Sequence, residues 1–402
     1  MKTKFTSITL AAACLALLGA TPINLRAATI TVANNADSGP GSLREALASA
    51  VNSDTIDASG VTGTITLTSD QLWVSNSVTL LGPGPGALTV TATNGMRVFA
   101  VTGTNVTISG LTIANAQGAG YGMGILTGFG ISLALNNCII SSNSTTLSGG
   151  GIFMSAVATL TVSNCTICDN SASASGGGVY NNHGVLAVVE STLSGNSAVD
   201  SGGGIYNDGT GSSATLTINA CTLSGNSAGN YGGGIANNGQ SSGATLTINA
   251  CTFSGNSAGG GGGGGIDNWV ATVEIGDTIL NASAGGGNIY SSYGSVISDG
   301  YNLSSDGSGS SFLIATGDQN NIDPKLGPLQ DNGGSTTTHA LLPDSPAIDQ
   351  GKSFGLSTDQ RGLPRPVDFF SLPDAAGGDT SDIGAFEFQK TQPTSVERGF
   401  SR

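Results

Sequence analysis

Positive charge is the scarcest feature of this 402-residue sequence, which has 12 Lys and Arg against 26 Asp and Glu. Charged residues make up only 9% of the chain, and no Lys or Arg occurs between Arg97 and Lys325. Nucleic acids and anionic membranes are bound mainly by basic patches. A formal net charge of −14 at pH 7 therefore excludes both as partners.

Long apolar runs are also missing, except at the N-terminus. Lys2 and Lys4 precede an apolar run from Ile8 to Ala20, and small residues follow up to Ala28. A basic start, an apolar run too short to span a bilayer and a small-residue cleavage zone are typical of a secretory signal peptide. We therefore expect residues 1–28 to be a signal peptide, the mature chain to be secreted, and no transmembrane helix to follow.

What the sequence has in abundance is glycine, with 64 residues, in lines that recur. "CTLSGNSAGNYGGGIANN" begins at Cys221, and "CTFSGNSAGGGGGGGIDN" begins at Cys251. Aligned copies place three columns in register, 26 to 31 residues apart. The columns are Cys138, Cys165, Ser191, Cys221 and Cys251; Asn143, Asn170, Asn196, Asn226 and Asn256; and Ile152, Val179, Ile205, Ile235 and Ile266.

Within each copy the apolar period is two, which indicates short β-strands. Leu216 and Ile218 alternate with Thr215 and Thr217, and glycine-rich corners separate the strands. A repeat of this length cannot bury its apolar side alone, so successive copies must stack. We predict an all-β fold, a right-handed parallel β-helix over residues 61–315. A β-propeller is the alternative, but its blades need about 40 residues or more.

The stacking of copies predicts a structural role for each repeated column. Stacked Asn side chains can form an amide ladder, and glycine permits positive φ at corners. The Cys column, interrupted by Ser191, is interpreted as small residues in the core rather than a disulfide framework. The alternative for Cys165 and Cys168 is half of a metal-thiolate site, but the sequence has no second such pair.

Both ends of the solenoid need protection, because open sheet edges invite aggregation. Ser42 and Glu45 form a capping box, and Leu43, Ala46, Leu47 and Ala50 share one helical face. We predict an N-terminal cap with this short helix over residues 29–60. Residues 316–388 are rich in Pro and Asp and are predicted to be an irregular C-terminal cap lying on the rod, with residues 389–402 as a disordered tail.

Acidic residues of the C-terminal cap are the candidate ligands for a cofactor. Carboxylate oxygens are the ligands that calcium prefers. The candidates are Asp368, Asp374, Asp379 and Asp382. No other cofactor is expected.

Motifs near both ends carry a family resemblance. "ITVANNADSGPGSLREAL", "DSPAIDQG", "DQRGLPRP" and "DIGAFE" resemble the ends of bacterial secreted β-helix proteins of the choice-of-anchor Q and CSLREA types, although Gly41 stands where the latter have Cys. The repeats resemble those of chlamydial polymorphic outer membrane proteins, whose Phe-x-x-Asn matches Phe253 to Asn256. These resemblances imply a β-helix that is secreted or lies on the outer surface of a bacterium, with an adhesive role. They supply no catalytic residues.

Enzymatic alternatives depend on charged side chains. A β-helical lyase needs a basic residue in the middle coils, and the sequence has none there. A hydrolase needs at least two neighbouring carboxylates. The coils offer Asp169, Glu190, Asp200, Asp208, Asp267, Glu274 and Asp277. Convergence of three of them in a groove would favour hydrolysis.

A flat array of threonine is a further alternative, because such arrays occur in ice-binding rods. The outward threonines are Thr159, Thr161, Thr215, Thr217, Thr245 and Thr247. Thr also simply suits exposed strand positions, and this is the interpretation we prefer.

The sequence therefore predicts a monomeric secreted or cell-surface β-helix with an adhesin-like, structural or display role and no evident catalytic site. The alternative is a β-helix that binds or degrades polysaccharide. A polysaccharide or a cell-surface molecule is the expected partner.

Overall fold

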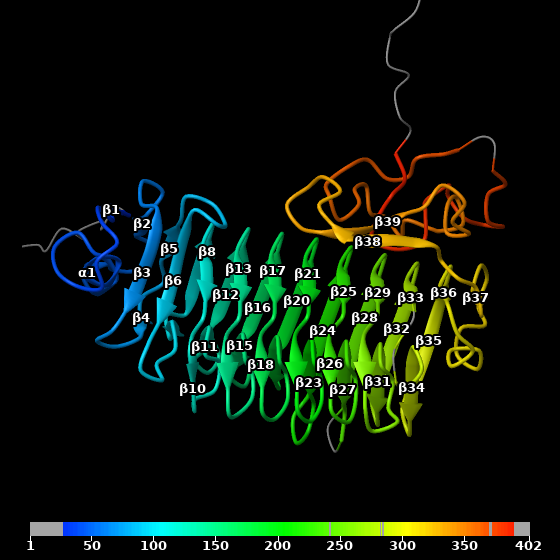
Figure 1. The fold of residues 1–402 in the computed structure, drawn as a ribbon, viewed down its shortest axis with the longest axis horizontal. Helices are drawn as coiled ribbons and strands as arrows, with labels where there is room; N and C mark the ends of the chain where they lie inside the picture. The colour runs from blue at the N-terminus through cyan, green and yellow to red at the C-terminus, as the bar shows by residue number, and fades with distance from the viewer. Residues whose placement is uncertain (1–26, 241–242, 282, 284, 370–371, 390–402) are drawn as a thin grey trace, which may run out of the picture.

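The computed structural model describes residues 27–240, 243–281, 283, 285–369 and 372–389. The predicted signal peptide, apart from its last two residues, and the predicted tail, apart from Gln389, lie outside these residues. The chain winds into a right-handed parallel β-helix, which confirms the predicted fold class (Figure 1). In the described part of the chain, no helix is long and apolar enough to cross a membrane.

Four parallel sheets run along the rod, each built from one short strand per coil. Sheet A consists of β1 (Thr29–Thr31), β2 (Thr55–Asp57), β5 (Thr79–Leu81), β8 (Asn105–Ser109), β12 (Ser132–Asn136), β16 (Thr159–Ser163), β20 (Val185–Val189), β24 (Ala214–Asn219), β28 (Ala244–Asn249), β32 (Thr272–Gly276) and β35 (Ser295–Gly300). Sheet B consists of β3 (Gly63–Leu67), β6 (Leu88–Ala92), β9 (Thr112–Ala114), β13 (Ile139–Ser141), β17 (Thr166–Cys168), β21 (Thr192–Ser194), β25 (Thr222–Ser224), β29 (Thr252–Ser254), β33 (Ile279–Asn281), β36 (Leu303–Ser304) and β37 (Gln319–Asn320).

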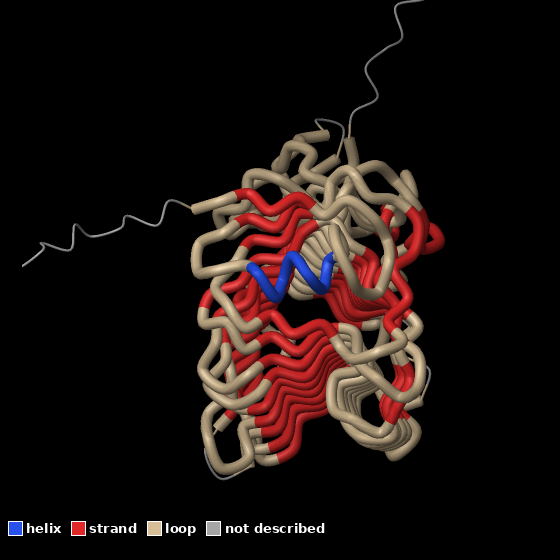
Figure 2. Tube along the Cα trace, turned by 90° about the vertical axis from the view of Figure 1, so that its left-hand side faces the viewer, coloured by secondary structure: helices blue, strands red, loops and turns tan. Residues whose placement is uncertain are grey.

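The other two sheets are smaller. Sheet C consists of β4 (Leu72–Val74), β7 (Phe99–Val101), β11 (Ile125–Thr127), β15 (Ile152–Met154), β19 (Val179–Asn182), β23 (Ile205–Asp208), β27 (Ile235–Asn238), β31 (Ile266–Trp269) and β34 (Ile289–Ser292). Sheet D consists of β10 (Gln117–Gly118), β14 (Ser144–Thr145), β18 (Ser171–Ala172), β22 (Ser197–Ala198), β26 (Ser227–Ala228) and β30 (Ser257–Ala258). Figure 2 looks along the rod and shows how the strands of successive coils lie over one another.

The core of the rod is a set of apolar ladders produced by in-register pairing. On sheet C, Ile205 pairs with Ile235, which pairs with Ile266, and all three side chains are buried. Leu216 and Leu246 pair in the same way on sheet A. Because every coil presents a similar residue at the same place, one continuous core runs through the solenoid.

The predicted asparagine ladder is confirmed and fully buried. Nδ2 of Asn196 donates to Oδ1 of Asn226 at 2.9 Å and to the carbonyl of Ile167 at 2.8 Å. Oδ1 of Asn196 accepts from the backbone N–H and Nδ2 of Asn170, at 3.1 and 3.0 Å. The Asn196 amide therefore bonds to the preceding coil through Ile167 and Asn170 and to the following coil through Asn226.

A second amide ladder lies beneath sheet C and was not predicted. It links Asn181 to Asn207 at 2.7 Å, Asn207 to Asn237 at 2.8 Å and Asn237 to Asn268 at 2.9 Å. These side chains are also buried. The rod is thus joined along its length by two rows of amide hydrogen bonds.

The cysteine column lies in the core, as predicted. Cys138, Cys165, Cys221 and Cys251 are buried free thiols, and the backbone N–H of Cys165 donates to Oγ of Ser191 at 3.0 Å. Ser191 therefore takes the place of a thiol in this column. Cys168 faces outward, where burial and Asp169 raise the pKa of its thiol to about 12. In the described chain, no group of three metal-ligating side chains includes these cysteines.

Glycine is required at the corner after sheet D because the coils approach each other closely there. Gly232 has φ of 62°, a conformation that residues with a Cβ rarely adopt. A Cβ on Gly233 would lie 2.2 Å from the carbonyl oxygen of Ser257 in the next coil. The repeated glycines thus permit stacking at this corner.

The N-terminal end of the core is covered by α1 (Leu43–Ser49), which lies across the end of the stack (Figure 2). Oγ of Ser42 accepts from the N–H of Glu45, whose carboxylate accepts from the N–H of Gly41. Leu43, Ala46 and Leu47 are buried against the first coils. The predicted helix and its buried face are confirmed, and the same N-terminal segment supplies β1 and β2 of sheet A.

The C-terminal segment, residues 321–369 and 372–389, lies along the side of the rod over sheet B (Figure 1). It contains one antiparallel pair, β38 (Leu326–Gln330) and β39 (Thr338–Leu341). Oγ1 of Thr222 donates to Gln360 at 2.6 Å, and Oγ1 of Thr252 accepts from the N–H of Ala385 at 3.1 Å. Thr222 and Thr252, which point outward from sheet B, are thereby buried.

A buried ion pair fastens this segment to the rod. Arg365 contacts the carboxylate of Asp277 through Nη2, and its Nη1 donates to the carbonyl of Gly384 at 2.6 Å. Both charged side chains have no solvent exposure. Burial raises the pKa of the Asp277 carboxyl well above its usual range, and the Arg365 guanidinium opposes this shift.

Loss of one ladder amide is expected to destabilise the rod. Asn196→Ala leaves buried N–H and C=O groups without partners, so we expect the free energy of unfolding to fall by about 2–3 kcal/mol. Urea unfolding followed by circular dichroism measures this loss. Asn105→Ala, at an exposed strand position, is the control and should change stability by less than about 0.5 kcal/mol. Equal losses in both variants would contradict the role of the ladder.

Loss of Arg365 is expected to release the C-terminal segment. Arg365→Ala leaves the Asp277 carboxylate buried without its cation, which costs about 3–5 kcal/mol. Limited proteolysis should then cleave the segment at least tenfold faster. Lys325→Ala is the control, because its ion pair with Asp344 is exposed and contributes about 1 kcal/mol or less. Unchanged proteolysis of Arg365→Ala would show that the pair does not hold the segment.

Candidate ligand-binding site

A stack of aromatic rings runs along the outer face of sheet C. Tyr121, Phe153, Tyr180 and Tyr206 follow one another, with ring centroids 4.6, 5.0 and 5.0 Å apart. The last two pairs are stacked, with interplanar angles of 13° and 26°. In-register pairing causes this arrangement, because Phe153, Tyr180 and Tyr206 occupy equivalent positions of β15, β19 and β23.

The stack stops after Tyr206, although the sheet continues. The next residues of the same column are Ala236, Asp267 and Tyr290, on β27, β31 and β34. Neighbouring strands lie about 4.8 Å apart, so Tyr206 and Tyr290 are roughly 14 Å apart along the rod. We call the space between them, over Ala236 and Asp267, the rung gap.

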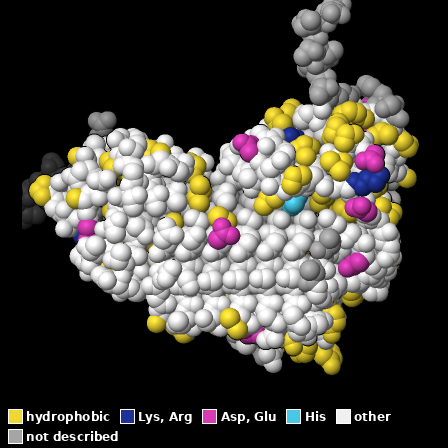
Figure 3. Space-filling view, viewed as in Figure 1, with side chains coloured by type: hydrophobic (Ala, Val, Ile, Leu, Met, Phe, Trp, Pro, Cys, Tyr) yellow, Lys and Arg dark blue, Asp and Glu magenta, His cyan; other side chains and the backbone are white. Residues whose placement is uncertain are grey.

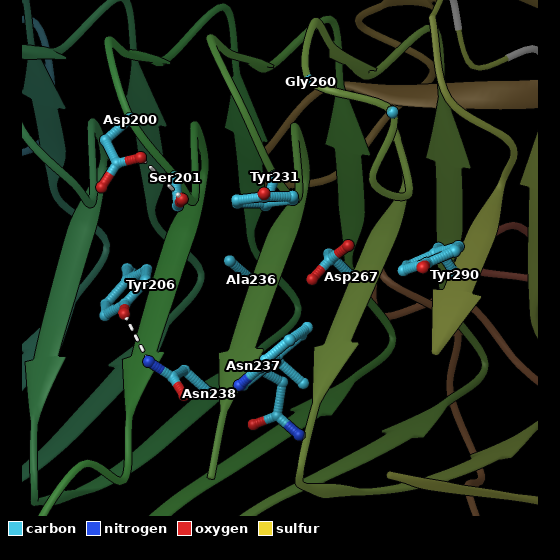
Figure 4. Close-up of a pocket in the computed structure, with 12 residues that line it drawn as sticks. Asp200, Ser201, Tyr206, Tyr231, Ala236, Asn237, Asn238, Gly260, Asp267 and Tyr290 are labelled. Carbon is cyan, nitrogen blue, oxygen red and sulfur yellow. Dashed lines mark hydrogen bonds between the residues drawn. The ribbon is translucent and has the colours of Figure 1, made fainter. Parts of the chain in front are cut away.

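The rung gap is a pocket of about 420 Å³, within the usual size range of small-molecule sites. Figure 4 shows Tyr206 on one side, Ala236 on the floor, and Asp267 and Tyr290 on the other side. One face of Tyr206 stacks on Tyr180, and its other face is directed at the rung of Ala236. Nδ2 of Asn238 donates to the hydroxyl of Tyr206 at 2.8 Å and holds this ring in place.

The upper wall of the pocket comes from the turns that precede sheet C. Tyr231 bridges to Ser201 of the preceding coil, and Gly260 and Gly261 belong to the run from Gly259 to Gly265. A Cβ on Gly262 would lie 2.5 Å from Oδ2 of Asp267 and 2.7 Å from Tyr231. The glycine run therefore leaves the space that side chains of a typical turn would fill.

Two carboxylates line the pocket. Asp267 is only 5% exposed, and burial raises the pKa of its carboxyl to about 6. Its Oδ2 accepts from the N–H of Gly263 at 3.2 Å, while its Oδ1 has no hydrogen-bond partner among the described residues. Oδ1 of Asp200 accepts from Asn230 at 2.8 Å and from Ser201 at 3.3 Å. Asp267 therefore offers an uncommitted acceptor to a ligand.

No positive side chain balances these carboxylates on sheet C, because the sequence has no Lys or Arg from residue 98 to residue 324. In the view of Figure 3, dark blue side chains gather on the C-terminal segment, while the coils beneath it carry few charges of either sign. The C-terminal segment packs on sheet B. The pocket is thus acidic and aromatic.

The structure separates most of the carboxylates that the sequence offered as hydrolytic candidates. Asp200 and Asp267 both line the pocket, but Asp208 accepts from the hydroxyl of Tyr180 at 2.7 Å, and Asp277 pairs with Arg365. Asp169, Glu190 and Glu274 do not line the pocket. Two carboxylates rather than three line this pocket, so the condition set for hydrolysis is not met there.

The calcium candidates of the C-terminal segment fall into separate places. Asp368 and Asp374 lie with Asp349, and one ligand oxygen of each lies within 4.8 Å of the others. Asp379 accepts from Ser353 at 2.5 Å. Asp382 is buried and accepts from the N–H of Asp349 at 2.9 Å. The structure thus brings two of the four candidates together, and calcium binding stays a prediction.

The outward threonines of sheet A do not form an unbroken array. Thr159 pairs with Val185, which pairs with Thr215, and Ala187 likewise lies between Thr161 and Thr217. The interruption at β20 disfavours ice binding, which needs a regular flat row.

The pocket was missed in the sequence because it depends on a difference between repeats. The residue that follows the conserved aliphatic position is Phe153, Tyr180 and Tyr206 in three copies, then Ala236 and Asp267. That break coincides with the seven-glycine run, Gly259 to Gly265. Repetition reveals the residues that are identical between copies, whereas the pocket depends on residues that differ.

The Chlamydia polymorphic membrane protein repeat matches residues 190–208. No curated protein matches the chain. The crystal structure of pectate lyase Pel9A is similar with a TM-score of 0.48 and 15% sequence identity, covering 91% of this chain and 98% of that chain. The repeat match covers part of one coil, and the chain is a β-helix repeat protein.

Proposed function

We propose that the protein is an extracellular β-helix of the bacterial surface type that binds carbohydrate in the rung gap. The observation that carries this proposal is the aromatic face of Tyr206, which is directed into a pocket instead of onto another ring. Sugar rings have apolar C–H faces that stack on aromatic rings and polar edges that need hydrogen bonds. The rung gap combines both kinds of surface.

The polar groups of the pocket are placed around its aromatic wall. Asn238 and the hydroxyl of Tyr206 lie at one end, and Asp267 lies at the other (Figure 4). Few precisely placed polar groups in an otherwise apolar pocket are typical of sites for small ligands. A sugar lying on Tyr206 would therefore have hydrogen-bond partners at its edges.

Extracellular location is supported by two independent features. The N-terminal sequence has the pattern of a signal peptide, and the Chlamydia polymorphic membrane protein repeat matches residues 190–208. A rod with a binding site on one side suits an adhesive or display role. This role accounts for the repeat without requiring catalytic groups.

Glycoside hydrolysis is the second candidate function. Three carboxylates do not converge in the pocket, but a pair is the minimum that this chemistry needs. The pair is Asp200 and Asp267, and burial raises the pKa of Asp267 to about 6. A raised carboxyl pKa suits a general acid. Release of reducing ends from a polysaccharide would identify this activity, and loss of that release in Asp267→Asn would assign it to the pocket.

Removal of the aromatic platform tests carbohydrate binding. A glycan array first identifies an oligosaccharide that the protein binds, and isothermal titration calorimetry then measures its affinity. Tyr206→Ala removes the ring on which the sugar stacks, so we expect affinity to fall at least tenfold, since one well-packed aromatic contact contributes about 1–3 kcal/mol.

The matched control is Tyr121→Ala, which removes a tyrosine from the far end of the same stack, where it packs on Phe153. Affinity should stay within twofold of the unmodified protein. Absence of any bound glycan, or equal losses in both variants, would contradict the proposal.

A further inference from the structure

The charge of the rung gap restricts the sugars that it can accept. Asp200 and Asp267 line it, Asp208 lies one rung away, and the lining contains no Lys, Arg or His. A uronic acid would bring a third carboxylate into this surface without any cation to pair with it. Anionic polysaccharides such as polygalacturonate are therefore disfavoured.

A neutral sugar would leave the carboxylate of Asp267 without a positive charge beside it. Asp267 is nearly buried, and a ligand over Ala236 would remove the remaining water from its Oδ1. A neutral hydroxyl can donate one hydrogen bond, but an ammonium group also neutralises the carboxylate. The site is therefore better matched to a ligand with positive charge.

The aromatic residues add to this preference. Tyr206, Tyr231, Trp269 and Tyr290 all line the pocket. The face of an aromatic ring attracts a cation, and the attraction strengthens when the cation is desolvated. A protonated amine in the rung gap would thus meet aromatic rings on several sides and the carboxylate of Asp267.

We propose that the rung gap selects an amino sugar, a pyranose ring that carries a protonated amine, with its ring on Tyr206 and its ammonium at Asp267. This inference rests on the proposed carbohydrate-binding function and specifies its ligand class. The rung next to Tyr206 is the place for the sugar ring, because Ala236 presents only a methyl group there. The following rung is Asp267, so the amine and the carboxylate are adjacent.

Three oligosaccharides of equal length provide the test: a hexamer of β-1,4-linked glucosamine, its fully N-acetylated counterpart and hexagalacturonate. Calorimetry at pH 6.5 should show the glucosamine hexamer binding at least tenfold more tightly than the acetylated form, with no binding of hexagalacturonate. Equal affinity for the first two would overturn amino-sugar selection and leave carbohydrate binding intact. Failure to bind any glycan, here or on an array, would overturn both proposals.

Asp267→Asn keeps the shape of the side chain and removes its charge. This variant should lose at least tenfold in affinity for the glucosamine hexamer and should bind the acetylated hexamer as before. Glu274→Gln is the control for net charge, because Glu274 is exposed on sheet A, and it should retain the full preference. Retention of the preference in Asp267→Asn would contradict the assigned role.

The pH dependence gives a second readout. Asp267 faces Asp200, the tyrosines of the lining and the backbone of the glycine run, and its pKa is raised to about 6. Affinity for the glucosamine hexamer should rise as the pH increases through about 6, because the carboxylate forms. It should fall again at higher pH, where the amine of the sugar loses its proton. An affinity that does not vary between pH 5 and 9 would overturn the ion pair.

Discussion

In-register stacking of the coils is the constraint on which the rest of this structure depends. Each residue of a strand pairs with its equivalent in the next coil, as Ile205, Ile235 and Ile266 do. A similar side chain then repeats about every 4.8 Å. Inward columns become apolar ladders and amide ladders, and outward columns become rows on the surface. The aromatic stack on sheet C and its interruption are both consequences of this register.

The same constraint explains how much of the molecule could be predicted from the sequence. Residues that repeat at a fixed spacing, such as Asn196 and Cys221, were placed correctly because their spacing alone defines their column. The capping helix was predicted because Ser42 and Glu45 are a local signal. The path of the C-terminal segment could not be predicted, because Gln360 bonds to Thr222 of sheet B and Arg365 pairs with Asp277, just before β33, and both partners are more than 85 residues away in the sequence. Only the folded register brings those groups together.

The binding site depends on departures from the repeat rather than on the repeat itself. Ala236 and Asp267 interrupt an aromatic column. The turn above them consists of glycines, so no side chains from that turn fill the space. None of these residues is unusual alone, and the pocket appears only when three adjacent coils are considered together. A stable scaffold thus tolerates local exceptions on its outer face, since the core and both amide ladders continue beneath them. The scarcity of basic residues then determines the electrostatic character of the site.

Filling the rung gap with an aromatic side chain tests the assignment of the binding site most directly. Ala236→Tyr should extend the aromatic stack, because consecutive rings at 5.0 Å are already present at Phe153, Tyr180 and Tyr206. The measurement is glycan affinity by calorimetry, with the melting temperature recorded for the same samples. We expect an unchanged melting temperature and at least a tenfold loss of affinity, since the new ring occupies the place of the sugar. A folded variant that binds the glycan as tightly as the unmodified protein would contradict the assignment of the site to the rung gap.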